Sequence, residues 1–210
     1  RVENQVEAIV YALDPNLRVL CSFELDGSSD SIQLMQGALD EQGLDQKATE
    51  ITGSAPVLMI PNILNAEICE HLVEVWETGE TESTGVEQSA AGRREEKVAD
   101  DVKRRRDLTV NDESLIKLLS SNVGRRVIPE LRKAFAYHAT RFEGFKIACY
   151  EADVGGFFDA HRDNLSPSTA HRRFAMSLNL NDEYEGGQLR FPEYGVDLYK
   201  PDAGAGLLFS

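Results

Sequence analysis

The stretch Cys149-Tyr-Glu-Ala-Asp-Val-Gly-Gly-Phe-Phe-Asp-Ala-His161-Arg-Asp163-Asn164 decides how the rest of the chain is interpreted. Its centre is an H-x-D motif made by His161 and Asp163. In an extended segment, residues two positions apart point to the same side, so this imidazole and carboxylate would lie next to each other. A nitrogen and a carboxylate oxygen, with other positions left open, are typical ligands of a non-haem iron(II) site. The three residues alone also fit a surface turn at the end of a strand.

A second stretch follows the motif: Phe174-Ala-Met-Ser-Leu-Asn-Leu-Asn-Asp-Glu-Tyr-Glu-Gly-Gly-Gln-Leu-Arg-Phe-Pro192. Together with Tyr150–Asn164, it resembles the prolyl 4-hydroxylase-like branch of the iron(II)/2-oxoglutarate dioxygenases. In that family a strand with a Tyr leads through a Gly-rich turn to H-x-D, and then to a strand that ends in Leu-Asn. A Gly-Gly-x-Leu-x-Phe-Pro segment comes next. The order, spacing and residue types match over most of residues 55–210.

The resemblance implies a double-stranded β-helix (jelly-roll) dioxygenase domain over residues 55–210, preceded by helices and incomplete at its C-terminus. The pattern of elements independently predicts an α+β class, because helices come first and antiparallel strands follow. Helices are expected after Asn65 and over Asp112–Tyr137. Strands are expected over Pro56–Pro61, Gly144–Tyr150, Arg173–Asn181, Gly187–Pro192 and Gly204–Phe209.

Residues 1–52 are expected to form a separate unit. Two strands within residues 7–25 are joined by a turn at Asp14-Pro15-Asn16, and Gly27–Asp30 precedes an amphipathic helix. This β-hairpin plus helix resembles a partial thioredoxin-like segment, the C-terminal part of a peroxiredoxin-like domain. Cys21 lies within a strand, so we interpret it as a small core residue and not as a peroxidatic thiol.

The dioxygenase resemblance implies the roles of the site residues. It assigns His161 and Asp163 as metal ligands and catalytic residues, and Tyr150 and Asn179 as residues that bind the cosubstrate. Asn179 stands where many relatives have a Tyr. The distal His, and the cation that pairs with the far carboxylate of 2-oxoglutarate, are expected beyond Ser210. Residues 1–210 alone are therefore expected to be catalytically inactive and to bind iron weakly.

His171 is the other histidine after the motif, and we do not expect it to bind the metal. It comes eight residues after Asp163 and opens an expected strand, whereas the third ligand of the family lies several strands later. We interpret it as part of an exposed entrance to that strand.

The predicted function is an iron(II)- and 2-oxoglutarate-dependent oxygenase that hydroxylates a protein side chain or a small molecule. Iron(II), 2-oxoglutarate and ascorbate are the expected cofactors, with O2 and an unidentified primary substrate as partners. Two alternatives stay open: a non-catalytic metal-binding or interaction barrel, and an accessory domain of a thiol peroxidase. Stoichiometric iron binding without succinate formation would favour the first alternative, and a Cys-containing N-terminal half in the parent chain would favour the second.

Composition restricts the partners and the compartment. The formal net charge of −14 argues against a general nucleic-acid-binding surface, because a polyanion would be repelled. No apolar run is long enough to cross a membrane, and no signal peptide is recognisable in the first residues, which lack an initiator Met. Cys21, Cys69 and Cys149 form no disulfide pattern, so a reducing cytoplasm is expected.

Residues 78–107 carry glycines and charges of both signs and end in Lys103-Arg104-Arg105-Arg106-Asp107. Such a charge run usually forms a solvated face. The functional alternative is a mobile lid whose cations attract an anionic substrate or product.

Overall fold

A computed structural model describes residues 8–13, 17, 19–25, 29–40, 48, 50–83, 86–90, 93–97 and 102–210 of the chain. The chain divides into two compact units, Arg1–Thr52 and Gly53–Ser210. Helices and strands are mixed, which is consistent with the predicted α+β class. The predicted jelly-roll and thioredoxin-like folds are more specific than the α+β class, and they stay predictions.

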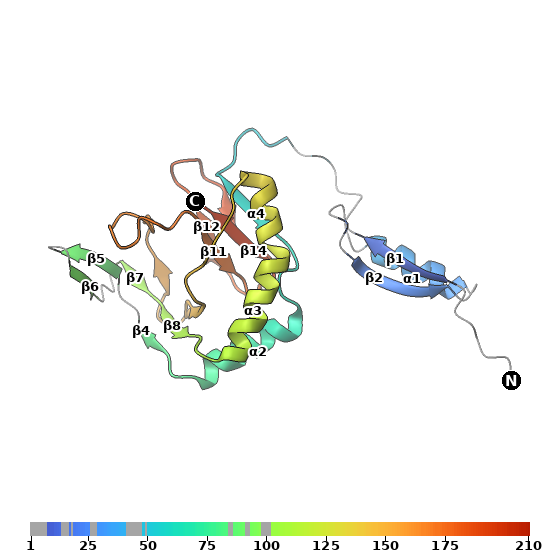
Figure 1. Cartoon of the computed structure of the whole chain (residues 1–210), viewed down its shortest axis with the longest axis horizontal. Helices are drawn as coiled ribbons and strands as arrows, with labels where there is room; N and C mark the ends of the chain where they lie inside the picture. Colours follow the sequence, from blue (N-terminus) through green and yellow to red (C-terminus); the bar gives the residue numbers. More distant parts are fainter. Residues whose placement is uncertain are drawn as a thin grey trace. The chain divides into compact units, whose positions relative to one another are not determined.

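The first unit contains the expected hairpin and helix (Figure 1). Strand β1 (Ala8–Leu13) pairs antiparallel with β2 (Val19–Leu25), and helix α1 (Ser29–Asp40) follows. The expected Asp14-Pro15-Asn16 turn lies outside the described residues. The apolar stripe predicted for the helix is partly exposed, since Ile32 and Leu34 are 55% and 60% accessible.

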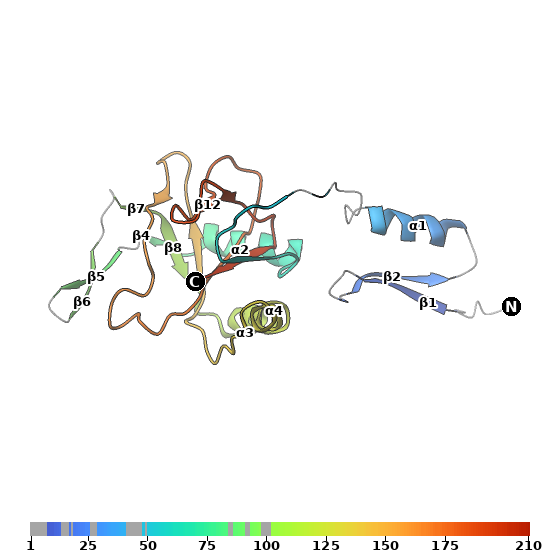
Figure 2. The ribbon, with the colours of Figure 1, turned by 90° about the horizontal axis from the view of Figure 1, so that it is seen from above.

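Helices α2 and α3 of the second unit begin with side-chain caps. Helix α2 (Ala66–Thr78) starts after Asn65, whose Oδ1 accepts from the backbone N–H of Ile68 at 3.0 Å, as expected for an N-cap. Asp112 caps α3 (Glu113–Arg126) in the same way. Helix α4 (Ile128–Phe135) follows α3 after one residue, and Figure 2 looks down both helices. None of the helices in the described part of the chain is long and apolar enough to span a bilayer.

Short antiparallel strands make up the rest of the second unit, in two sheets of three strands and three pairs. The first sheet has the order β11 (Ala175–Leu178), β14 (Gly206–Phe209), β3 (Val57–Ile60). The second has the order β4 (Glu82–Ser83), β8 (Arg106–Thr109), β9 (Lys146–Cys149). The pairs are β10 (Phe157–Phe158) with β7 (Lys103–Arg104), β12 (Leu189–Arg190) with β13 (Leu198–Tyr199), and β5 (Val86–Ala90) with β6 (Arg93–Lys97). Strands β3, β9, β11, β12 and β14 lie within the expected ranges but are shorter than predicted, whereas β4 to β8, β10 and β13 were not expected.

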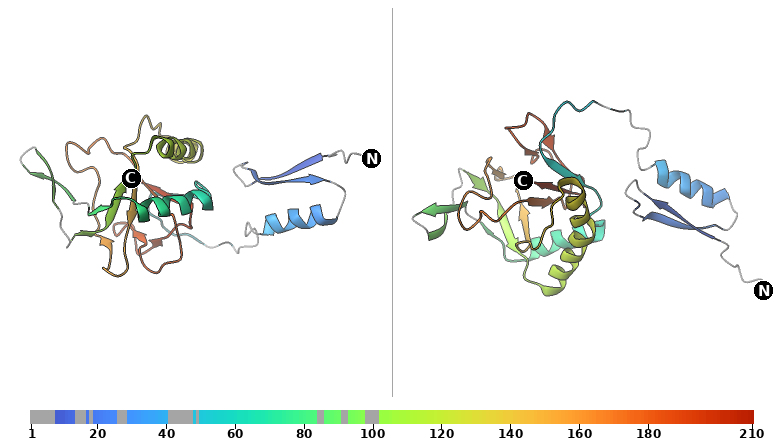
Figure 3. Two further views of the ribbon diagram at one scale, coloured as in Figure 1. Left: turned by 90° about the horizontal axis from the view of Figure 1, so that it is seen from below. Right: turned by 45° about the horizontal axis from the view of Figure 1, so that its top comes forward.

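One hydrophobic core joins the helices of the second unit to both of its three-stranded sheets. Figure 3 shows the ribbon of these helices and strands from two further directions. The burial of these apolar side chains removes them from water and is the main favourable contribution to folding. The core side chains include Ile60 and Leu208 from the first sheet, Leu108 and Ile147 from the second, and Leu72, Leu115, Leu119, Val123 and Leu131 from the helices.

The solvated charge run predicted at residues 103–107 is wrong. Lys103 and Asp107 are buried, with 7% and 1% of their surface exposed, because residues 103–109 form β7 and β8 inside the unit. Arg104 and Arg106 lie on the outer face of the same run. Strands β4 to β8 begin within the described parts of residues 78–107, and the lid function stays a prediction.

Gly204 connects the start of β14 to two other segments. Its carbonyl oxygen accepts from the backbone N–H groups of Ile63 and Leu64 at 2.8 and 3.0 Å, and its own N–H donates to the Asn179 carbonyl oxygen at 2.8 Å. Its φ is +77°, and a Cβ atom there would lie 2.3 Å from the Leu64 carbonyl oxygen. This position therefore requires glycine for two reasons, the left-handed backbone and the close approach of the backbone.

Gly204→Ala is expected to lower the free energy of unfolding by about 2–3 kcal/mol, since left-handed strain and overpacking each cost about 1–3 kcal/mol. Gly186→Ala is the matched control, because Gly186 has the same φ of +77° with open space around its Cβ position. The control is expected to lose only about 1 kcal/mol. Urea unfolding of both variants measures the difference, and equal losses would show that the close approach contributes nothing.

Candidate functional site

A tight turn after Tyr150 brings the backbone of Gly156 against that of Tyr150 and Glu151. The Gly156 N–H donates to the Glu151 carbonyl oxygen at 2.9 Å, and a Cβ atom on Gly156 would lie 2.8 Å from the Tyr150 Cα. Only glycine permits this contact between backbones. The chain then enters β10, where Phe158 pairs with Lys103 of β7.

The H-x-D motif itself follows β10 and is not part of a strand, contrary to the extended conformation considered for it. His161 Nε2 nevertheless lies 3.3 Å from Asp163 Oδ1. The imidazole stacks on the Phe158 ring with centroids 3.7 Å apart and an interplanar angle of 21°. The aromatic contact, instead of strand geometry, orients the histidine toward the carboxylate.

The contact made by the second ring nitrogen of His161 shows which kind of ion can lie between Nε2 and the Asp163 carboxylate. Nδ1 is 2.7 Å from the Asp159 carbonyl oxygen, which can only accept, so Nδ1 carries the hydrogen. Neutral His161 would then direct an Nε2 lone pair at a carboxylate oxygen, and two acceptors repel. The facing atoms are compatible with a cation between them, either a proton or a metal ion.

The pKa values shift in the direction that this geometry requires. The hydrogen bond with Asp163 raises the pKa of His161 above its ordinary value, against the opposing effect of burial. The same hydrogen bond lowers the pKa of Asp163 below its ordinary value. Each member of the pair therefore favours the charged form of the other.

The pair also fits two neighbouring positions of a metal ion. In an octahedral site with bonds of about 2.1 Å, adjacent ligand atoms are about 3 Å apart, close to the 3.3 Å observed. Within the ranges that the structure describes, no group of three His, Cys, Asp or Glu side chains is arranged to hold a metal. Two ligands of the expected set of three are thus brought together, and the third stays a prediction.

The comparison with protein families found one similarity in this part of the chain. Residues 145–210 match the model of the 2OG-Fe(II) oxygenase superfamily. The match supports a 2OG-Fe(II) oxygenase domain, and with it iron(II), 2-oxoglutarate and O2 as the implied cofactor and cosubstrates. Searches of curated proteins and of solved structures found no match.

A buried ionic cluster that sequence analysis missed lies next to the pair of His161 and Asp163. Arg105 contacts the Asp107 carboxylate through Nε at 2.6 Å and through Nη2 at 2.7 Å. Lys103 Nζ lies 3.7 Å from the same carboxylate. Arg105 Nη1 also donates to the Tyr150 hydroxyl at 3.3 Å. Tyr150, predicted to bind the cosubstrate, is thus attached to this cluster.

Phe158 connects the ionic cluster to the ligand pair. Lys103 Nζ lies 5.2 Å from the centroid of its ring and the Arg105 guanidinium carbon lies 5.8 Å from it, while His161 stacks on the ring. Cations at such distances are attracted by the ring electrons. A signal for this arrangement was present in the sequence: every second residue of the run 103–107 can face inward if the run is a strand.

Asn179 is attached to different residues. Its Nδ2 donates to the Tyr184 hydroxyl at 3.0 Å and to the Pro201 carbonyl oxygen at 2.7 Å. Both amide hydrogens are thus engaged by the loops after β11. Donation from Asn179 to a cosubstrate carboxylate would replace one of these bonds, and its predicted role stays a prediction.

His171 takes part in an exposed clamp beside the motif. Its Nε2 is 2.7 Å from Glu143 Oε1, and Arg172 donates to both oxygens of Glu143 through Nε at 3.0 and 3.1 Å. Arg172 Nη1 also donates to the Asp163 carbonyl oxygen at 3.4 Å. The clamp thereby connects the loop before β9 to the backbone of a proposed ligand.

Glu143→Gln is expected to lower the free energy of unfolding by at most about 1 kcal/mol near neutral pH, because exposed ion pairs are screened by water. The hydrogen bonds from Arg172 hold the pKa of Glu143 below its ordinary value. Its stabilising contribution is therefore present above the unfolded-state pKa of about 4.3 and disappears as the pH falls through the lower folded-state pKa. Urea unfolding of both proteins at about pH 7 and about pH 3 tests this. A difference that grows at the lower pH would contradict it.

Proposed function

We propose that this chain carries an iron(II)- and 2-oxoglutarate-dependent oxygenase of the prolyl 4-hydroxylase-like branch, with His161 and Asp163 as two of its metal ligands. One observation carries the proposal. His161 Nε2 and Asp163 Oδ1 face each other at 3.3 Å, and both residues lie within the range that matches the oxygenase family. A tautomer fixed by the Asp159 carbonyl supports it, because it leaves Nε2 available as a ligand.

Iron(II) held by these residues would couple the oxidative decarboxylation of 2-oxoglutarate to the oxidation of the primary substrate. The residues of the chain supply the geometry. Phe158 holds the plane of the His161 ring, and the Asp159 carbonyl fixes the proton on Nδ1. Arg172 restrains the backbone of Asp163. Tyr150 directs a hydroxyl group that can hydrogen-bond to a carboxylate of the cosubstrate.

Finer parts of the proposal rest on the sequence resemblance. The primary substrate is a protein side chain or a small molecule, and ascorbate is a further cofactor. The first unit is the C-terminal part of a thioredoxin-like domain, which its hairpin and helix support. Free thiols at Cys21, Cys69 and Cys149 support a reducing compartment such as the cytoplasm.

A second candidate is a non-catalytic metal-binding or interaction barrel. It is favoured by the finding that, among the residues described, no three candidate ligands come together. Such a protein would bind a divalent ion without consuming 2-oxoglutarate.

The test is an assay of the full-length protein with iron(II), ascorbate and 2-oxoglutarate under air. The proposal expects formation of succinate and carbon dioxide above the background given by the metal alone. Stoichiometric iron binding without succinate formation would overturn the oxygenase and favour the second candidate.

A further inference from the structure

The ionic cluster of Lys103, Arg105 and Asp107 is built around a fixed carboxylate. Asp107 is 1% exposed and lies on β8, the central strand of the sheet β4-β8-β9. Its two oxygens meet two nitrogens of Arg105, with Nε to Oδ1 at 2.6 Å and Nη2 to Oδ2 at 2.7 Å. The hydrogen bond from Nη2 and the ion-pair approach of Nε, which lacks hydrogen-bond geometry, form a two-point contact that holds the guanidinium against the carboxylate.

The remaining edge of that guanidinium is directed at the aromatic ring of Tyr150. Nη1 donates to the hydroxyl oxygen at 3.3 Å, and the guanidinium carbon lies 5.6 Å from the centroid of the ring. The backbone of Tyr150 is held from the other direction by the close approach of Gly156. Ring, hydroxyl and backbone of Tyr150 are therefore restrained by separate contacts, while 44% of its surface stays open.

The Tyr150 hydroxyl accepts a hydrogen bond from a cation, and this changes how the hydroxyl donates its own hydrogen. The oxygen atom is occupied by Arg105, so the O–H bond is directed away from it. The positive donor also draws electron density from the oxygen, and hydrogen bonds in such chains strengthen one another. Tyr150 thus becomes an oriented donor, suited to an anionic acceptor.

We propose that Arg105 is a positioning residue that acts through Tyr150, orienting its hydroxyl toward a carboxylate of 2-oxoglutarate, with Asp107 holding Arg105 in place. The proposal rests on the proposed function, and it adds to that function a residue outside the range that matches the family. Arg104 and Arg106 have other contacts: Arg104 donates to the Val154 carbonyl oxygen, and Arg106 lies over the Trp76 ring. The role is therefore specific to one arginine of the run.

The kinetic test is a double-mutant cycle that uses Arg105→Lys, Tyr150→Phe and the combined variant. Lysine keeps the positive charge next to Asp107 but cannot reproduce the two-point contact, so the cluster is expected to fold while Tyr150 loses its partner. Each single variant is expected to raise the KM for 2-oxoglutarate about tenfold, as for a lost hydrogen bond to a charged group. The double variant is expected to match Tyr150→Phe, because Arg105 acts only through that hydroxyl.

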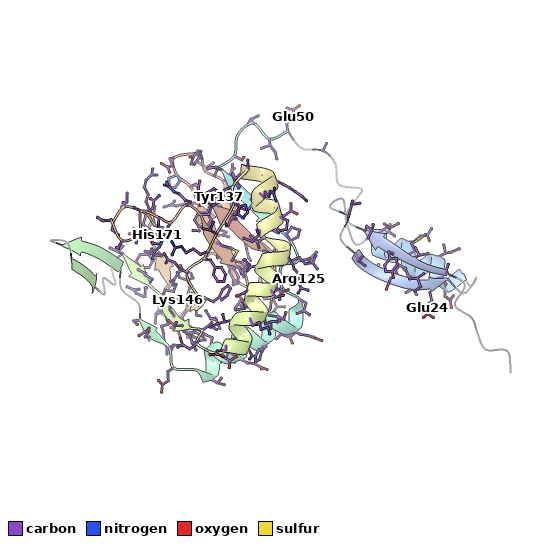
Figure 4. The ribbon with its side chains drawn as sticks, viewed as in Figure 1. Glu24, Glu50, Arg125, Tyr137, Lys146 and His171 are labelled. Atoms are coloured by element: carbon purple, nitrogen blue, oxygen red, sulfur yellow. The ribbon has the colours of Figure 1, made fainter. Side chains whose placement is uncertain are left out.

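Arg125→Lys is the matched control, because Arg125 is exposed and lies on the outer side of α3 (Figure 4). Its KM for 2-oxoglutarate is expected to equal that of the wild type. Single-variant effects that multiply in the double variant would overturn the proposal, since they would show that Arg105 acts independently of Tyr150.

A spectroscopic measurement tests the positioning role of Arg105 independently of the proposed oxygenase activity. In metal-free protein labelled at the tyrosine Cζ, the Tyr150 resonance is assigned by its loss in Tyr150→Phe. Arg105→Lys is expected to shift this resonance, whereas Arg125→Lys leaves it unchanged. An unmoved resonance overturns the positioning role, while a wild-type protein that consumes no 2-oxoglutarate overturns the proposed function.

Discussion

Asp163→Ala is expected to reduce the turnover of 2-oxoglutarate by more than about 100-fold. Removal of a charged ligand should cost more than removal of an outer hydrogen-bond partner, which typically costs about 10–100-fold in activity or metal affinity. The side chain is 43% exposed, so its loss should leave the fold intact. Succinate formation and iron(II) affinity measure the effect, and thermal unfolding confirms that the variant is folded.

Asp153→Ala is the control, because Asp153 is an exposed carboxylate in the turn that precedes β10 and has no assigned role. The same substitution there should leave turnover and iron affinity unchanged. If the Asp163→Ala variant formed succinate at the wild-type rate, this would contradict the metal-ligand assignment. A loss of activity without any loss of iron affinity would contradict it as well.

Asp107→Ala is expected to lower the free energy of unfolding by about 3–5 kcal/mol. The substitution removes the carboxylate that faces Arg105 and Lys103, whose side chains are 21% and 6% exposed. Cations in such surroundings cannot regain full hydration in the folded state, so the loss of a counterion is costly. Chemical unfolding in urea measures the change.

The exposed ion pair of Arg162 and Glu193 provides the comparison. Its side chains are 62% and 56% accessible, with a nitrogen–oxygen distance of 2.6 Å. Glu193→Ala should therefore cost no more than about 1 kcal/mol, because water screens both charges. If Asp107→Ala cost equally little, the cluster would have no structural importance.

Local signals in the sequence predicted those parts of the fold that depend on neighbouring residues. Asn65 acts as the expected N-cap, since its side chain reaches the backbone N–H three residues later without help from the rest of the chain. The exact helix boundaries within Asp112–Tyr137 were not predicted: α3 ends at Arg126 and α4 starts at Ile128.

The candidate site was also predictable only in part, because some of its contacts join segments that are far apart in the sequence. The pairing of His161 with Asp163 followed from their spacing, although stacking on Phe158 and not a strand produces it. Arg105 and Asp107 were not recognised, because a run of charges indicates solvent exposure unless it is known to lie in a strand. Pairing of β8 with β4 and β9 joins segments far apart in the sequence, and no local pattern specifies it.

The burial of Lys103 and Arg105 also affects how the chain responds to proteases. Residues 103–106 are four consecutive basic residues, a preferred cleavage sequence for trypsin in an unfolded chain. In the folded unit they belong to β7 and β8 or lie between them, paired with β10 and with the sheet. A protease must draw an extended segment into its own cleft, so cleavage here requires these strands to separate first. The rate of cutting within this run is thus a direct measure of how often the second unit opens.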